Sequence, residues 1–101
     1  METLRELVRE GRITWAPGAR AWIARPGDIT EALAREGFAE FKADAARSHR
    51  DRTPTGGIWQ GLDARTGAVA SAIWVRGDED DRAVVFIDVD GTPVNEPDHP
   101  T

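Results

Sequence analysis

Val69-Ala70-Ser71-Ala72-Ile73-Trp74-Val75 is the middle one of three short apolar runs, and it decides the fold class. Branched and aromatic residues of this kind are typical of strands. The other two runs lie at residues 58–62 and 83–89, and turn-forming residues separate all three. Gly67 ends the first turn and suits the left-handed position of a bulged hairpin. We therefore predict an antiparallel meander across residues 58–89.

The first third of the chain predicts a short helix followed by a hairpin. Leu4, Leu7 and Val8 share one helical face within residues 3–10. The next two runs, at 13–16 and 20–25, contain tryptophan and are separated by Pro17-Gly18, which favours a β-hairpin.

The long helix has the strongest signal in the sequence. Asp28 suits the N-cap position, and Glu31 three residues later completes a capping box. Apolar residues then recur at every fourth position, so we predict one long helix over residues 28–46, packed on a face of the sheet. Gly37 lies on this stripe, where it either lets another backbone approach closely or splits the segment into two helices. A loop is expected at 47–57. The element order is therefore α-β-β-α-β-β-β, an α+β domain with a mostly antiparallel sheet.

The composition is that of one small globular domain. The chain has 101 residues, and we assign residues 1–91 to a single α+β domain and 92–101 to a flexible, proline-rich C-terminal tail. With no cysteine and two histidines, we expect no catalytic thiol, no metal site and no cofactor. The sequence has neither a run of ~18 apolar residues nor an apolar export signal, so we expect a cytoplasmic protein without a membrane segment.

The chain is acidic, with a formal net charge of −5. Residues 1–52 carry a net charge of +1 and residues 53–101 carry −6. Such a surface repels phosphate backbones, which argues against nucleic acid and favours a protein partner or self-association. Twelve of the thirteen basic residues are arginine, which is typical of a GC-rich genome, and we expect a bacterial source.

The meander is apolar on both faces, whereas a strand with one face in water alternates apolar and polar residues. On the middle strand the two sets of side chains are Val69, Ile73 and Val75 against Ala70, Ala72 and Trp74. The long helix covers one face, and the other is covered either by the N-terminal helix and hairpin or by another chain. We expect the Ala70, Ala72 and Trp74 face to need the additional cover, which predicts a homodimer.

Residues 84–92 read Val-Val-Phe-Ile-Asp-Val-Asp-Gly-Thr and resemble the first motif of the haloacid-dehalogenase-like phosphatases. The resemblance implies Asp88 as the phosphoryl-accepting nucleophile and Asp90 as the general acid, both near Mg²⁺. That family places the motif in a parallel sheet and supplies a Ser or Thr, a Lys and an acidic pair downstream. Here Lys42 lies upstream and nine residues follow Thr92. We therefore interpret the motif as a strand that ends in an Asp-Gly turn, and we expect no catalytic residue.

Five residues are candidates for ligand binding: Arg47, His49, Arg50, Trp59 and Trp74. The basic ones precede a Thr- and Gly-rich segment, where guanidinium groups and free amides can hold a phosphate or carboxylate. A solvated loop is the alternative interpretation. Tryptophans are frequent at binding sites, although they also fill small cores.

Two functions fit these observations. The favoured one is a small non-enzymatic binding module that engages a protein partner or itself through a sheet face and its acidic C-terminal half. The alternative is a small-ligand-binding or catalytic domain. It would use a tryptophan-lined pocket between helix and sheet, with an Arg/His anion site beside it.

Overall fold

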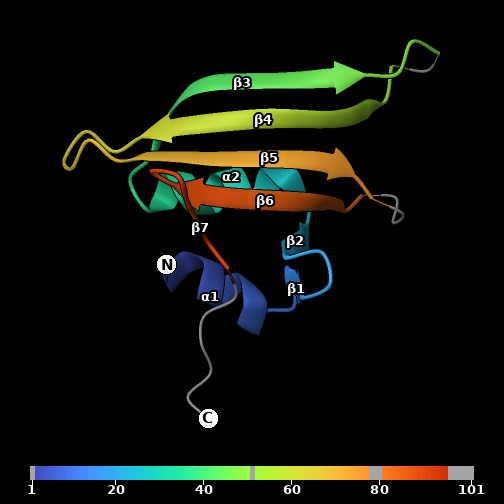
Figure 1. Ribbon diagram of the computed structural model, residues 1–101. Coiled ribbons are helices and arrows are strands. Elements are labelled where there is room, and N and C mark those ends of the chain that lie inside the picture. The colour runs from blue at the N-terminus through green and yellow to red at the C-terminus, as the bar shows by residue number, and fades with distance from the viewer. Residues whose placement is uncertain (1, 51, 78–80, 96–101) are drawn as a thin grey trace.

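Every strand pairing in the part of the chain that the structure describes, residues 2–50, 52–77 and 81–95, is antiparallel (Figure 1). This computed structural model has two helices there, α1 (Glu2–Arg9) and α2 (Pro26–Arg35). The strands are β1 (Thr14–Ala16), β2 (Ala21–Ala24), β3 (Ala39–Arg47), β4 (Pro54–Leu62), β5 (Val69–Arg76), β6 (Ala83–Val89) and β7 (Thr92–Pro93). They form one sheet in the order β1-β2-β6-β5-β4-β3, with β7 paired to β6. The prediction of an α+β fold with a mostly antiparallel sheet is confirmed.

The predicted meander is the run of β4, β5 and β6, although β4 begins at Pro54 rather than at residue 58. Its first turn is built on Asp63, whose carbonyl oxygen accepts hydrogen bonds from the amides of Thr66 and Gly67 at 3.2 and 2.7 Å. Gly67 has φ +77°, the left-handed conformation that the sequence predicts at this position.

The N-terminal hairpin of β1 and β2 joins the sheet on the side of β6 that β5 leaves free. Trp15 and Trp22 face each other across the hairpin, with their rings edge to face and their centroids 5.1 Å apart. The Trp22 indole is 1% exposed, and its Nε1 donates a hydrogen bond of 2.8 Å to the carbonyl oxygen of Val94. The hairpin is therefore fastened both to β6 and to the segment that follows β7.

The segment predicted as a tail begins with ordered pairing. Thr92 and Pro93 form β7 against β6, and the amide of Val94 donates to the carbonyl oxygen of Ile87 at 2.8 Å. The other part of the predicted tail, residues 96–101, lies outside the described residues.

The prediction of one long helix over residues 28–46 is wrong, because α2 has ten residues and ends at Arg35. Gly37 has φ +108°, and the amide of Phe38 bonds back to the carbonyl oxygen of Leu33 at 3.1 Å, which closes the helix. The chain then reverses into the nine-residue strand β3, which pairs with β4. The four-residue apolar spacing that suggested a helix thus runs across a helix end and a strand, and the predicted loop at 47–57 shrinks to 48–53.

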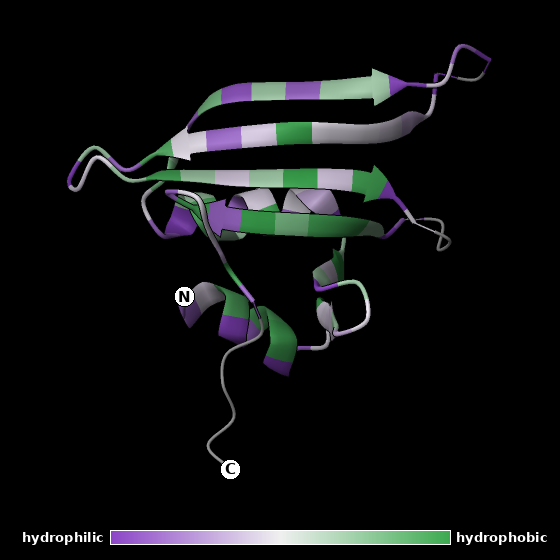
Figure 2. Ribbon diagram, in the orientation of Figure 1, coloured by the Kyte–Doolittle hydropathy of each residue, from purple (hydrophilic) through white to green (hydrophobic). Residues whose placement is uncertain are grey.

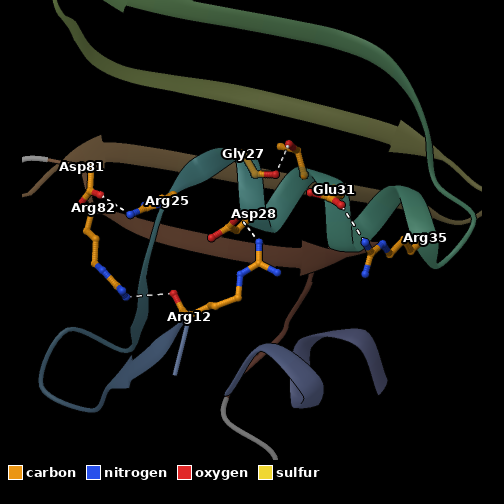
Figure 3. A network of polar contacts seen from close by, with 9 residues as sticks. Arg12, Arg25, Gly27, Asp28, Glu31, Arg35, Asp81 and Arg82 are labelled. Carbon is orange, nitrogen blue, oxygen red and sulfur yellow. Dashed lines mark hydrogen bonds and ion pairs between the residues drawn. The ribbon is translucent and has the colours of Figure 1, made fainter. Parts of the chain in front are cut away.

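The start of α2 also differs from the prediction. The helix begins at Pro26, and the N-cap residue is Arg25, which makes no side-chain capping bond. Asp28 therefore lies within the first turn, where its carboxylate accepts a hydrogen bond of 2.6 Å from Arg12 Nη2 (Figure 3). Glu31 pairs with Arg35 one turn later, at 2.8 Å. Both acidic residues thus stabilise the helix through arginine rather than through its backbone.

Further contacts join the N-terminal end of α2 to the start of β6. Arg25 Nη2 lies 2.7 Å from Asp81 Oδ2, and Arg82 Nη1 donates to the carbonyl oxygen of Arg12 at 2.9 Å (Figure 3). The hairpin, the helix and β6 therefore meet in one polar network at this end of the molecule.

The opposite end of α2 is fastened by Asp63 and Arg65 in the β4–β5 turn. Arg65 Nη2 donates to Asp63 Oδ2 at 3.0 Å and to the carbonyl oxygen of Glu36 at 3.3 Å. Its hydrogen bonds lower the pKa of Asp63, a residue that is 6% exposed. The Glu36 carboxylate accepts a bond of 3.0 Å from the Thr3 amide, which lowers the pKa of Glu36. One helix end thus binds both the sheet turn and the start of α1.

The core lies between α2 and the face of the sheet that it covers, which we call the covered face. The buried side chains of that face are Trp22, Ala24, Trp59, Ala70, Ala72, Ala83, Val85 and Ile87. Against them pack the buried residues of the helices and of the segment after α1, namely Leu4, Leu7, Ile13, Ile29, Ala32 and Leu33.

Two glycines make room for tryptophan on the covered face. A Cβ at Gly61 would lie 2.5 Å from the ring of Trp59, and a Cβ at Gly57 would lie 2.7 Å from Nε1 of Trp74. Because real Cβ atoms do not approach so closely, any side chain at either position would displace an indole ring. Each ring therefore rests on bare backbone, which lets the sheet keep α2 close.

Candidate functional site

The candidate site is the other face of the sheet, which we call the open face. Its apolar side chains stand in two rows across neighbouring strands. One row runs through Ile58, Ile73 and Phe86, which are paired on β4, β5 and β6. The second row contains Val75, Val84 and Ile23 on β5, β6 and β2. The two rows are adjacent, so their side chains form one apolar patch.

Three side chains of this patch are large and exposed. Ile73 is 46% exposed, Val75 50% and Phe86 45%. Both helices pack elsewhere: α2 lies behind β5 and β6 in the view of Figure 1, and α1 packs against α2. Figure 2 shows that β6 is hydrophobic along most of its length. Within the described residues, no helix covers the open face.

Polar residues border the apolar patch. Gln60 and Ser71 are paired on β4 and β5, and Gln60 Nε2 donates to Ser71 Oγ at 3.1 Å. Asp88 continues this row on β6 and Lys42 continues it on β3. Asp44 lies at the end of the neighbouring row, beside Ile58. An apolar centre with a polar rim is the usual anatomy of a protein-binding surface.

A hollow adjoins the patch on the side of β6 where β2 and β7 pair. It has a volume of about 320 Å³, and its lining includes Ile73 and Phe86 of the open face together with Arg20, Asp88 and Asn95. Its walls thus combine apolar side chains with a few polar groups, so the hollow can accept one side chain of a partner.

The sequence singled out the wrong face as the one in need of cover. Ala70 and Ala72 are buried at 0% and 1% exposure, and Trp74 is half-buried on the same covered face. The bulkier set on β5, Ile73 and Val75, is the exposed one. On β5 the signal that could have identified it is size, because the two alanines leave room for α2 whereas Ile73 and Val75 are the bulkier pair.

The three basic candidates lie together in the turn between β3 and β4. Arg47 ends β3, and its Nη1 donates to the carbonyl oxygen of Arg52 at 3.1 Å. The amide of Arg50 donates to Ser48 Oγ at 3.2 Å, and His49 is exposed. Since Arg47 and Arg50 are exposed, the turn has the charge for an anion but no enclosing walls.

The two tryptophan candidates line separate hollows beside α2. Trp59 borders one of about 430 Å³ together with Thr30, Glu31 and Glu40, and its Nε1 donates to Glu40 Oε1 at 2.8 Å. Trp74 borders a smaller one of about 210 Å³ at the opposite end of the helix. Neither hollow is lined by Arg47, His49 or Arg50, so the predicted Arg/His site does not adjoin the tryptophan-lined pocket.

The phosphatase-like motif occupies an antiparallel strand, since β6 pairs antiparallel with both β2 and β5. Asp90 and Gly91 form the turn into β7, with φ of +52° and +84°. Asp90 makes two hydrogen bonds to the backbone of Val69. Its amide donates to the Val69 carbonyl oxygen and its Oδ1 accepts from the Val69 amide, each at 2.8 Å. Asp90 thus ties the turn to β5, whereas Asp88 belongs to the rim of the open face.

Within residues 2–50, 52–77 and 81–95, no three acidic or histidine side chains gather as a metal centre would require. No helix in that part of the chain is long and apolar enough to span a bilayer. Comparisons of the chain with protein-family models, with curated proteins and with solved structures find no match.

Proposed function

We propose that this protein is a small binding module that holds another polypeptide on the open face of its sheet. The observation that carries the proposal is the exposure of Ile73, Val75 and Phe86 at neighbouring positions of an uncovered face. Exposed apolar patches with a polar rim are typical of interaction sites.

The partner that fits is a segment with an apolar anchor flanked by lysine or arginine. The anchor would enter the hollow beside Phe86, where Arg20 and Asp88 can orient its backbone. The basic flanks would face Asp44 and Asp88 on the rim, in a chain whose net charge is −5. Charge complementarity of this kind raises association rates and selects partners.

The proposal can be tested with a random peptide library displayed on phage and selected against the immobilised protein. We expect enriched peptides to contain one or two large apolar residues next to lysine or arginine. Phe86→Lys should weaken their binding by about tenfold or more, because it places a charge at the centre of the patch. Added salt should weaken the binding further, since the flanking contacts are exposed.

Val8→Lys is the matched control, because Val8 is a large apolar residue on α1 that is 37% exposed and lies away from the open face. It should leave peptide binding unchanged. The proposal is contradicted if selection on the wild-type protein enriches no peptide relative to the same selection on Phe86→Lys. Peptides that bind wild type and Phe86→Lys equally well contradict it too.

A second candidate function is binding of a small polar ligand in the hollow beside Trp59. The observation that favours it is the pair of carboxylates, Glu31 and Glu40, at a hollow of about 430 Å³, a volume within the range of ligand pockets. A ligand with amine or hydroxyl donors would suit these groups. A fragment screen by NMR should then shift the indole N–H resonance of Trp59, and Glu40→Gln should reduce the effect. Fragments that leave that resonance unmoved would count against this function.

A further inference from the structure

The strand β3 offers a second interaction surface, and it is separate from the open face. β3 stands at the end of the strand order, with β4 on one side and no strand on the other among the described residues. All nine of its residues are exposed. Phe41 on this strand is 58% exposed. An edge of this length is a template for pairing with another strand.

The register of β3 against β4 decides which residues share a face. Lys42 and Asp44 pair with Gln60 and Ile58, so both lie on the open face. Ala43 pairs with Trp59 and therefore lies on the covered face. In an antiparallel pair, residues directly opposite each other lie on the same face. If β3 pairs with a copy of itself, one residue must therefore lie directly opposite its own copy, with the two-fold axis between them. Each register is named below by that residue.

Only one such register within Lys42–Ala46 brings opposite charges together. An axis through Lys42 or Asp44 places that charge against its own copy, and an axis through Ala45 or Ala46 pairs no charges of opposite sign. An axis through Ala43 places Lys42 opposite the second copy's Asp44 and repeats the pair on the other side of the axis. Opposite charges at directly facing positions stabilise a strand pair, and like charges destabilise it.

We propose that β3 pairs with β3 of a second copy of this chain, antiparallel and with Ala43 at the two-fold axis. The strand is self-complementary in this register because Lys42 and Asp44 flank the axis at equal distances. Phe41 lies at the register irregularity between Glu40 and Lys42, at one end of this pairing. The pairing joins the two sheets into one continuous sheet and leaves Ile73, Val75 and Phe86 free on each copy, so it does not depend on the proposed function.

The first test is a single cysteine at the axis, which is possible because the natural chain has none. In the proposed dimer the two Ala43 Cα atoms lie about 4.5–5.5 Å apart, within the range that a disulfide spans. Ala45 lies on the same face of the same strand, but its two copies are about 14 Å apart. Under mild oxidation, Ala43→Cys should form a linked dimer about ten times faster than Ala45→Cys, because only its thiols lie within disulfide distance.

The second test reverses the charges and measures association by sedimentation equilibrium. Lys42→Asp or Asp44→Lys alone creates like-charge pairs and should raise the dimer dissociation constant by about tenfold or more. The double variant Lys42→Asp/Asp44→Lys restores opposite charges and should recover the wild-type constant. Both residues are exposed on an edge strand, so neither change should unfold the monomer. The melting temperature of each variant checks that the fold is retained.

Three results would overturn the pairing: a wild type that is monomeric up to about 1 mM, equal cross-linking at positions 43 and 45, or a double variant that stays as weak as the single ones. Peptide binding by an Ala43→Asp monomer distinguishes the two proposals, because this change places like charges at the axis and lies on the covered face, away from the rim residues Lys42 and Asp44. If the monomer binds selected peptides as well as wild type does, the open face works without β3 pairing. If Phe86→Lys loses the peptides but still cross-links through Ala43→Cys, each surface acts on its own.

Discussion

The two faces of β5 both carry apolar side chains, but one face is buried and the other is exposed. On one face Ala70 and Ala72 are fully buried under α2, and on the other Ile73 and Val75 remain about half exposed. The larger apolar residues are thus the ones in contact with water. The difference teaches that small residues on one strand make room for the helix, while the large side chains of the covered face, such as Trp22 and Trp59, come from other strands of the sheet. On β5 the bulkier pair is left exposed on the open face.

Removing an anchor of the covered face should have the largest effect. Trp22 is 1% exposed and bonds to the carbonyl oxygen of Val94, so Trp22→Ala leaves both a cavity and an unpaired oxygen. We expect a loss of about 3–5 kcal/mol in the free energy of unfolding, measured by urea denaturation. A loss below about 1 kcal/mol would mean that the hairpin is not held in the core as described.

Enlarging a residue on the covered face should cost less, and the matched change on the open face should cost almost nothing. Ala72→Leu adds three carbons where the exposed fraction is 1%, and overpacking of this kind costs about 1–3 kcal/mol. Val75→Leu adds one carbon to a side chain that is half exposed. Urea midpoints of the two variants measure the comparison directly. If the two variants were equally stable, size would not be what separates the faces.

The sequence predicted the elements that depend on local chemistry and missed those that depend on packing. The strands β5 and β6 and the left-handed Gly67 follow from branched residues and turn chemistry within a few positions. The segment from Ala39 to Arg47 has alanines at helical spacing, and only its pairing with β4 makes it a strand. Gly37 lies at the break, but a glycine at that point also fits a continuous helix that another backbone approaches closely. Local propensity could not decide between the two.

The candidate site was half predicted for a related reason. Alternation along the chain showed that both faces of the meander are apolar, yet it gives no information on which face the helix covers. That choice depends on Gly57 and Gly61 on β4, which lie opposite Trp74 and Ala70 of β5. The relevant small residues therefore become neighbours only in the folded sheet.

Acidification should loosen the covered side by a smaller amount. The Arg65 hydrogen bonds lower the pKa of Asp63 in the folded chain, so the unfolded chain binds a proton at higher pH than the folded one does. Asp63 therefore stabilises the fold above its ordinary pKa of about 4, and this contribution is lost as the pH falls through its lowered value. Asp63→Asn should be less stable than wild type at neutral pH, by less than either core change.

Urea midpoints at two pH values isolate this effect from the titration of other carboxylates. The difference between wild type and Asp63→Asn should be largest at neutral pH and should shrink once the pH is well below about 4, where the wild-type carboxyl becomes protonated. A difference that stays constant between these conditions would show that the charge of Asp63 is not what fastens Arg65 to the end of α2.

The smallest effect on stability should come from the open face. Phe86→Lys and Ile73→Lys replace side chains that are nearly half exposed, so each should change the free energy of unfolding by less than about 0.5 kcal/mol. Binding of a hydrophobic dye to the native protein should nevertheless fall, because the patch is interrupted. A large destabilisation would place these residues in the core and remove the distinction between the two faces.

The pairing of β2 with β6 also sets the order in which the chain can finish folding during its synthesis. Ala24 lies opposite Ala83, and Trp22 bonds to Val94 across 72 positions of sequence. At a translation rate of about 5–20 residues per second, roughly 3–12 s pass between the synthesis of β2 and that of its partner strand. Until then the indole of Trp22 lacks both its partner residue Val85 and its hydrogen-bond acceptor on Val94, so the hairpin cannot bury it as the finished sheet does.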